Sequence, residues 1–186
     1  MTGGGFWIAL LAGARILGGM TWIDCGPEHL EAIRAIFNDA IVNTTALYEC
    51  EQRPAEFMTE WFAAKQAHRQ PVLGALDDDG SLMGFGSYGP FRSQAAFRWT
   101  VEHSLYVAEP YRRRGLGRQL LQRLMARAGE QRFHLMIGVI DADNRASITL
   151  HEELGFEASG CLRQSGFKFG RWLDVVLYQR VLGGPP

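Results

Sequence analysis

Cysteine is scarce in this sequence of 186 residues: the chain has three, Cys25, Cys50 and Cys161. Their odd number and wide separation lack the paired spacing of a zinc site or a disulfide framework. We therefore expect no metal site, a reducing cytoplasmic setting, and a core role for each cysteine rather than a nucleophilic one. Internal repeats and low-complexity segments are also missing, which argues against a solenoid or a disordered chain.

An excess of charge of one sign is missing too, because 19 Lys and Arg residues face 20 Asp and Glu residues, for a net charge of -1. Such a balance gives no overall attraction to nucleic acid or to an anionic membrane. One basic cluster exists, at residues 112–114, but it lacks the interleaved aromatic residues typical of nucleic-acid binding. We expect neither a nucleic acid nor a membrane as the partner.

Long hydrophobic runs are absent as well. The apolar stretch Phe6 to Leu11 is too short for a membrane-spanning helix of about 20 residues, and the positive start of a signal peptide is missing before it. Met20 is followed at once by a strand pattern, so we interpret residues 1–19 as an upstream start or an added extension. A single domain over residues 20–182 and a tail at 183–186 complete the predicted organisation.

What the sequence does contain is a regular alternation of strand and helix patterns, typical of a mixed α/β domain. Apolar residues recur at helical spacing behind Pro27 as far as Asn43, after Pro54, and in two later segments, 116–128 and 145–154, the last ended by Gly155. Strand patterns occupy residues 22–24, 71–76, 82–88, 97–107, 135–140, 161–167 and 172–180.

The strongest motif is Arg112-Arg113-Arg114-Gly115-Leu116-Gly117, which lies between a predicted strand and a predicted helix. Its glycines let the backbone approach a ligand, and the helix start offers unpaired N–H groups and a positive dipole end to a phosphate. The pattern is neither a dinucleotide fingerprint nor a nucleotide P-loop. It predicts a pyrophosphate site; the alternative is a surface turn with solvated arginines.

In this context the loop resembles that of the GNAT superfamily of N-acetyltransferases, whose acetyl-CoA pyrophosphate loop reads Gln/Arg-x-x-Gly-x-Gly/Ala. Residues 99–107, 150–156 and 166–168, with Trp172 and Asp174, resemble the phosphinothricin and methionine sulfoximine acetyltransferase branch. The resemblance covers residues 20–182. It implies a mixed, strongly bent sheet flanked by about four helices and splayed near Val107, and a homodimer whose partner completes the substrate cleft.

The resemblance also implies acetyl-CoA as co-substrate, with contacts from the strand end, the loop and the next helix start. These contacts fall on Tyr106, Val107, Arg112, Arg113, Arg114, Gly115, Leu116, Gly117, Arg118, Asn144 and Ser147. Beside a strand bulge, the Val107 amide would polarise the thioester carbonyl. Asn144 equally suits a helix N-cap without any cofactor contact.

Two residues match catalytic positions of the family. Glu102 matches the general base, which the chemistry needs because an amine is mostly protonated at neutral pH. It lies five strand residues, about 16 Å, before Val107, which suits an extended pantetheine arm. A carboxylate paired with Arg98 or His103 is the alternative. His151 is a candidate acid for the leaving thiolate, and equally a half-buried histidine satisfied by hydrogen bonds.

For the acceptor, the resemblance implies the α-amino group of an amino-acid analogue, attacked directly without a covalent acyl-enzyme. Arg92 or Arg98 would hold the acceptor's carboxylate. Phe169 stands where strict phosphinothricin enzymes carry histidine, which favours methionine sulfoximine or sulfone over phosphinothricin. Peptide N-termini, another small amine, and a CoA-binding module without turnover are the alternatives.

Overall fold

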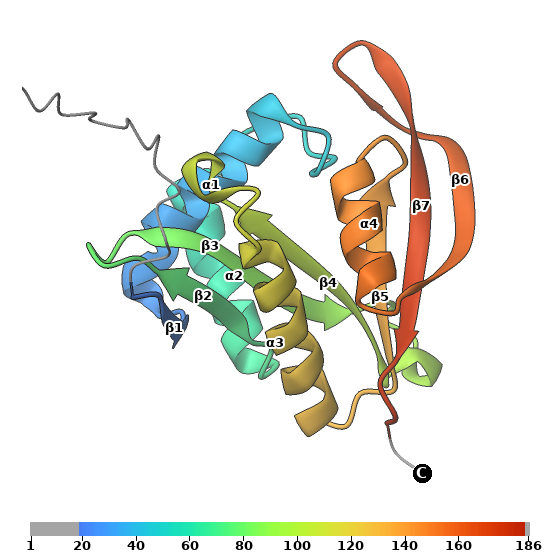
Figure 1. The fold of residues 1–186 in the computed structure, drawn as a ribbon, viewed down its shortest axis with the longest axis horizontal. Coiled ribbons are helices and arrows are strands. Elements are labelled where there is room, and N and C mark those ends of the chain that lie inside the picture. The colour runs from blue at the N-terminus through green and yellow to red at the C-terminus, as the bar shows by residue number, and fades with distance from the viewer. Residues whose placement is uncertain (1–18, 185–186) are drawn as a thin grey trace, which may run out of the picture.

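One seven-stranded mixed sheet organises residues 19–184, the part of the chain that this computed structural model describes (Figure 1). The interpretation of residues 1–18 lies outside the described residues. The strand order is β1-β2-β3-β4-β5-β7-β6, and only β4 and β5 pair in parallel. The strands are β1 (Thr21–Asp24), β2 (Val72–Leu76), β3 (Leu82–Pro90), β4 (Thr100–Val107), β5 (Leu135–Asp141), β6 (Glu157–Lys168) and β7 (Arg171–Val181).

Four α-helices flank the sheet, as the sequence predicts: α1 (Leu30–Asn43), α2 (Ala55–Ala67), α3 (Leu116–Glu130) and α4 (Arg145–Glu153). The predicted apolar stripe of α3 is buried along its whole length. Gly155 ends the α4 segment with φ 75°, a conformation that glycine adopts without a steric penalty. The helix boundaries therefore follow from local chemistry that the sequence displays.

Two expectations about the strands and the cysteines are wrong. The strand expected from Phe97 begins at Thr100, because Ala95–Phe97 form a 3-10 turn closed by the Arg98 amide on the Ala95 carbonyl (3.2 Å). Of the three cysteines, only Cys25 is buried, whereas Cys50 and Cys161 are exposed. Cys50 lies in an irregular loop and Cys161 on the outer strand β6, where a small apolar residue has no core to join.

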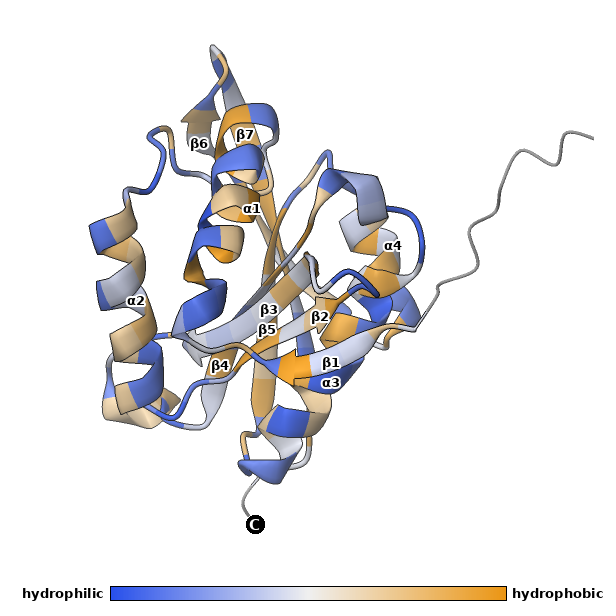
Figure 2. Ribbon diagram, turned by 90° about the vertical axis from the view of Figure 1, so that its left-hand side faces the viewer, coloured by the Kyte–Doolittle hydropathy of each residue, from blue (hydrophilic) through white to orange (hydrophobic). Residues whose placement is uncertain are grey.

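Helices cover both faces of the sheet (Figure 2), and each face has its own cluster of buried apolar side chains. On one face, Phe37 of α1 and Phe62 of α2 pack with Phe85 of β3. On the other face, α3 and α4 pack against β3, β4 and β5 through a cluster that includes Leu124, Ile148 and the fully buried Tyr88. Burial of such side chains stabilises each layer by roughly 1.5 to 3 kcal/mol per residue. The two layers lie on either side of the sheet, and the strands β4 and β5 separate between them.

The opening lies where β4 and β5 part. Their paired residues run from Thr100–Leu135 to His103–Gly138 and stop there, four residues before Val107. The bulge implied for β4 is not present in its pairing with β3, whose register is unbroken from Gly84–Val107 to Pro90–Val101. Divergence from β5, not a bulge in the β3 ladder, opens the sheet at this point.

An unbroken ladder also decides which way the β4 amides point. Ala108 donates to the Met83 carbonyl (2.9 Å), and amides of an antiparallel strand alternate between its two edges. The Tyr106 amide therefore points towards β3, and the Val107 amide points to the opposite edge. Because β5 has already diverged there, the Val107 N–H faces the opening.

Candidate active site

A cleft of about 1410 Å³ occupies the opening between β4 and β5. Its walls come from the end of α1 and the following loop, the second half of β4, the start of α3, the end of β5, and α4. Most of the sequence-predicted site residues line it: Glu102, Tyr106, Val107, Arg112, Arg113, Gly115, Leu116, Gly117, Arg118, Asn144, Ser147 and His151. Arg92, Arg98 and Arg114 are not among the lining residues.

The glycine loop forms one end of the cleft. Gly115 is the N-cap of α3 with φ 79°, and Arg113 also has a positive φ of 60°. The loop therefore turns sharply into the helix, whose first amides have no intrahelical partner. A Cβ at Gly117 would meet only Leu150 and Leu105 at 3.6 and 3.7 Å, so the protein itself leaves space beside this residue.

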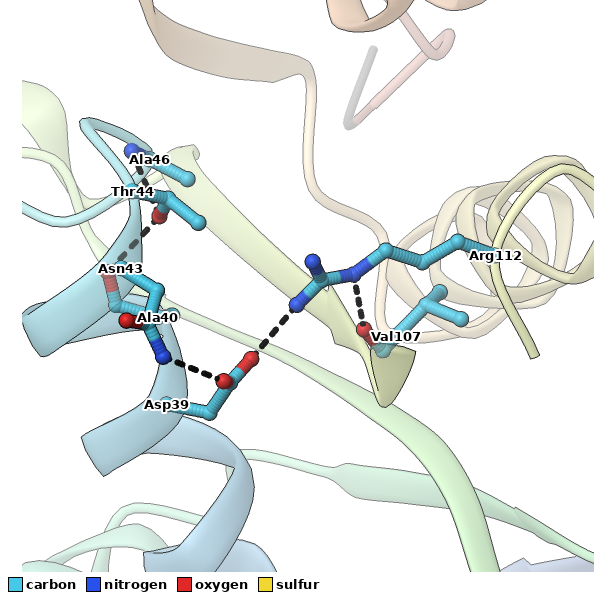
Figure 3. Close-up of polar contacts among 7 residues, drawn as sticks. All are labelled: Asp39, Ala40, Asn43, Thr44, Ala46, Val107 and Arg112. Atoms are coloured by element: carbon cyan, nitrogen blue, oxygen red, sulfur yellow. Dashed lines mark hydrogen bonds and ion pairs between the residues drawn. The ribbon is translucent and has the colours of Figure 1, made fainter. Parts of the chain in front are cut away.

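Arg112 connects this loop to both neighbouring walls (Figure 3). Its Nε donates to the Val107 carbonyl (3.0 Å) and its Nη2 donates to Asp39 of α1 (2.7 Å). Asp39 in turn accepts from Asn43 Nδ2 at 2.8 Å. The Arg112 side chain thus braces the end of β4 against α1, a structural task that the sequence does not indicate.

The other arginines of the cluster are placed differently. Arg118 forms an ion pair with Glu153 of α4, across the mouth of the cleft. The Arg114 guanidinium lies 5.7 Å from the centre of the Tyr111 ring and is exposed. Of the three consecutive arginines, Arg113 lines the cleft and forms no ion pair with another described residue, so it is the cation best placed for an anion there.

Asn144 caps α4, as one of its two interpretations expects, and it also lines the cleft, so the coenzyme contact stays a prediction. Its Oδ1 accepts from the Ser147 amide at 3.1 Å, the usual bond of an N-cap. The cap holds Ser147 and the first turn of α4 against the cleft.

Glu102 is half-buried on the α1 side of β4, on the same face as Ser104 and Tyr106. No described residue forms an ion pair with it, so neither the Arg98 nor the His103 pairing is present. Burial raises the pKa of its carboxyl above the ordinary value, and the positive charge of Arg92 lowers the pKa in part. A half-buried carboxylate without a bound cation can accept a proton from a ligand in the cleft.

His151 is almost fully buried, with 2% of its surface exposed, rather than half-buried. Its Nδ1 lies 2.7 Å from the Ser147 carbonyl, so this nitrogen carries the proton. Its Nε2, then bare in the neutral ring, accepts from His103 Nε2 at 3.0 Å. Burial lowers the pKa of both rings, that of His103 to about 3, so the pair is neutral at physiological pH.

A further wall of the cleft contains residues that sequence reasoning did not assign. The loop after α1, from Thr44 to Glu49, lines it together with Asp141 and Phe169. The Lys168 ammonium, which is buried, donates to two carbonyls of this loop. The Gly-Phe-Lys segment and the polar residues after Asn43 can both be recognised in the sequence. Nothing in the sequence indicates that these two segments contact each other in the folded protein.

Comparisons with known proteins agree on one family. A sequence model described as the Acetyltransferase (GNAT) family matches residues 30–156. The chain belongs to the GNAT acetyltransferase family. It is 46% identical to an L-methionine sulfoximine/L-methionine sulfone acetyltransferase of Pseudomonas paraeruginosa, over 84% of this chain and 91% of the relative.

Two solved structures have the same fold. A GNAT superfamily phosphinothricin acetyltransferase from Sinorhizobium meliloti, in complex with AcCoA, has a TM-score of 0.86 and 35% identity and covers 88% of this chain and 89% of its own. A ribosomal-protein-alanine N-acetyltransferase from Brucella melitensis has a TM-score of 0.84 and 40% identity over 87% of this chain and 99% of its own. The present chain is an acetyl-CoA-dependent N-acetyltransferase, which excludes a CoA-binding module without turnover.

The cleft of this GNAT enzyme fits acetyl-CoA on its own geometry. The start of α3 and the glycine loop present unpaired N–H groups and a helix dipole to a pyrophosphate. Between loop and Glu102, the second half of β4 offers an unpaired strand edge along which an extended arm can lie. Within residues 19–184, no helix is both long and apolar enough to cross a membrane.

Proposed function

We propose that the protein transfers the acetyl group of acetyl-CoA to the α-amino group of a small amino-acid analogue of the methionine sulfoximine, methionine sulfone or phosphinothricin type. The relatives' names support this class of acceptor. The single observation that carries the chemistry is the half-buried Glu102 carboxylate, without an ion-pair partner among the described residues, in the same cleft as the glycine loop.

Glu102 acts as general base in this proposal. It takes a proton from the acceptor's ammonium group, directly or through a water, and the freed lone pair attacks the thioester carbonyl. The tetrahedral intermediate loses its second N–H proton to water and collapses with cleavage of the C–S bond, which releases the N-acetyl product and CoA as a thiolate. A raised pKa brings the carboxylate closer to the operating pH, which makes it a better proton acceptor. None of the three cysteines lines the cleft, which supports direct attack without a covalent acyl-enzyme.

Val107 supplies the electrophilic assistance. Its amide faces the opening and donates to the oxygen on which negative charge develops, an interaction worth about 3 kcal/mol in comparable sites. The Arg112 bond to the Val107 carbonyl fixes the peptide that follows. The residues that hold the coenzyme in this proposal are Tyr106, Arg113, Gly115, Leu116, Gly117, Arg118, Asn144 and Ser147. Arg112 and Arg114, whose side chains contact Asp39 and Tyr111, contribute mainly through their backbones.

His151 has a positioning role in this proposal. Its only proton is bonded to the Ser147 carbonyl and its bare Nε2 is bonded to His103, so a proton for the leaving thiolate comes from water. Arg92, which acts on the pKa of Glu102, is the candidate partner of the acceptor's carboxylate. Arg98 lies in the 3-10 turn beside Trp99 and is the weaker candidate.

An acceptor screen with acetyl-CoA and a free-thiol readout tests the proposal. We expect turnover with methionine sulfoximine and methionine sulfone above that with phosphinothricin, since Phe169 lines the cleft where the resemblance would put histidine. The Brucella relative favours one second candidate, a peptide N-terminus, so a short peptide with an N-terminal alanine belongs in the panel. Turnover with the peptide alone would overturn the amino-acid proposal.

A further inference from the structure

The loop between α1 and α2 forms a wall of the cleft that has no regular structure of its own. Residues 44–48, here called the acceptor loop, all line the cleft that Glu102 also lines. They carry only bends and turns in the segment between Asn43 and Ala55. An irregular segment of this kind keeps one conformation only if contacts from elsewhere hold it.

Lys168 provides such contacts from the far end of the chain. It lies at the end of β6, and 4% of its surface is exposed. Its Nζ donates to the Thr44 carbonyl at 2.9 Å and to the Leu47 carbonyl at 2.6 Å. A buried ammonium requires such acceptors, because burial without them is strongly unfavourable.

The position of the Thr44 carbonyl makes this bond favourable. Thr44 is the C-cap of α1 and has an extended backbone, with φ −140° and ψ 167°, so its carbonyl has no intrahelical donor and lies next to the negative end of the helix dipole. A cation at this place neutralises the helix end and joins it to Leu47, three residues further along. One side chain therefore fixes both the start and the middle of the acceptor loop.

Two other contacts hold the acceptor loop to the C-terminal half of the chain. The Thr45 hydroxyl donates to the buried Asp141 carboxylate at the end of β5. The Tyr48 ring lies against Gly166 so closely that a Cβ there would come within 2.7 Å of it. The loop thus spans from α1 to the strands on the other side of the opening.

Lys168 also fixes the residue that faces the acceptor loop. Phe169 follows it in the β6–β7 turn with φ 50° and lines the cleft. The Lys168 Nζ lies 5.0 Å from the centre of the Phe169 ring, within the range of a cation–π contact. The ammonium is therefore shared between the two walls of the acceptor end.

We propose that Lys168 is a positioning residue that holds the acceptor loop and Phe169 as the two facing walls of the acceptor site, and thereby sets the affinity for the amino-acid acceptor. The inference rests on the proposed function. Binding to a preorganised wall avoids the cost of ordering it. The proposed pyrophosphate contacts come from another wall of the cleft, the glycine loop and the start of α3, so coenzyme binding should depend less on Lys168 than acceptor binding does.

Lys168→Met tests this, because methionine keeps an unbranched apolar stem and removes the donors. We expect the KM for methionine sulfoximine to rise about tenfold, as ordering the loop's side chains costs about 1.4 kcal/mol. The KM for acetyl-CoA and kcat should stay within about threefold of wild type. Lys65→Met is the matched control, since Lys65 also donates to a carbonyl, that of Tyr88 at 2.9 Å, but does not line the cleft.

Amide hydrogen exchange provides a readout that needs no turnover. Exchange of residues 44–48 should be at least about tenfold faster in Lys168→Met than in wild type or Lys65→Met. Faster loop exchange in a protein that acetylates none of the amino-acid analogues would refute the proposed function and leave the role of Lys168 intact. Unchanged exchange and unchanged acceptor KM in folded Lys168→Met would refute the inference, as would equal rises in both KM values.

If Lys168→Met does not fold, Thr45→Val examines the same wall. Valine keeps the volume of threonine and removes the bond to Asp141. The acceptor KM should again rise while the KM for acetyl-CoA does not. A Thr45→Val enzyme with wild-type acceptor KM and wild-type exchange of residues 44–48 would contradict a held acceptor loop.

Discussion

Two opposing effects act on the pKa of the Glu102 carboxyl. Its carboxyl is half-buried, which raises the pKa, and Arg92 is near enough to oppose part of that rise. As pH falls through this raised pKa the base is lost, so the acid limb of kcat/KM should lie above the pH at which an exposed glutamate titrates, near 4.5.

Glu102→Gln keeps the shape of this side chain but cannot accept a proton at neutral pH. We expect kcat/KM for methionine sulfoximine to fall by about 10²- to 10⁴-fold with little change in CoA binding. The variant's rate should recover as pH rises towards the pKa of the acceptor amine, because solvent then supplies the free amine. A pH–rate profile of both enzymes is the measurement. Wild-type activity of the variant at pH 7 would contradict the assignment.

Gly117 is a second residue whose role can be isolated. A side chain there meets only ordinary contacts, so Gly117→Asp should fold, but its negative charge would face a pyrophosphate at the start of α3. We expect isothermal titration to show CoA affinity at least about tenfold weaker, a difference of about 1.4 kcal/mol. Gly129→Asp is the control, because it adds the same charge near the other end of the helix, where a Cβ meets nothing within 4 Å.

Unchanged CoA affinity in folded Gly117→Asp would remove the loop from the coenzyme site. A drop of equal size in Gly129→Asp would assign the effect to net charge instead.

At the scale of single elements, most of the fold could be predicted because the signals are local. The α3 stripe, Pro27 in the 3-10 turn (Pro27–His29) that leads into α1, and Gly155 after α4 each depend on neighbours in sequence. The 3-10 turn before Thr100 was missed because Phe97 to Trp99 are apolar or bulky enough to read as strand. The hydrophobic pattern of three such residues cannot be distinguished from that of the first residues of a strand.

The site was predictable where one motif contains it and not where distant segments meet. Gly115, Gly117 and Glu102 stand in recognisable patterns along the chain. The hydrogen bonds from Lys168 to the acceptor loop join residues far apart in sequence, 124 residues from Thr44 and 121 residues from Leu47. No local pattern predicts such contacts. The same holds for Arg112 and Asp39, 73 residues apart.

Among the strand positions, Gly138 is the one where we expect an added side chain to reduce stability most. It forms the last paired position of β5 with β4, and a Cβ there would lie 2.8 Å from His151 Nε2 and 3.2 Å from His103 Nε2. Because the Ser147 carbonyl holds the His151 ring, the pair has little freedom to move. Gly138→Ala should therefore destabilise the protein by about 1 to 3 kcal/mol.

Thermal unfolding measures this effect as a fall in Tm of about 2 to 4 °C for each kcal/mol in a chain of this size. Gly160→Ala is the matched control, because a Cβ at this β6 position meets nothing within 4 Å. Equal Tm values for Gly138→Ala and wild type would show that the His103–His151 pair yields without cost, and would contradict a tightly held junction between β4 and β5.

At the scale of the whole molecule, the β6–β7 hairpin extends beyond the body of the sheet (Figure 1). Its outer part exposes large apolar side chains: Leu162 at 53%, Phe167 at 55%, Phe169 at 57% and Trp172 at 59%. Apolar groups gathered on one protruding element are typical of an association surface. Because Phe169 also lines the cleft, a partner seated on this hairpin would lie next to the acceptor end.

We therefore expect a homodimer in solution that forms through this hairpin, with the two-fold symmetry usual for dimers of one chain. Trp172→Glu should convert it to a monomer, since a charge at the centre of an apolar interface is left unpaired on both copies. Light scattering at micromolar concentration measures the mass of each variant.

Phe57→Glu is the control, because Phe57 is 40% exposed on α2, away from the hairpin, and this variant should remain a dimer. A wild-type monomer, or a dimer broken by Phe57→Glu and not by Trp172→Glu, would exclude the hairpin as the interface. If the dimer completes the acceptor site, Trp172→Glu should also raise the acceptor KM while acetyl-CoA binding, which depends on the start of α3, stays unchanged.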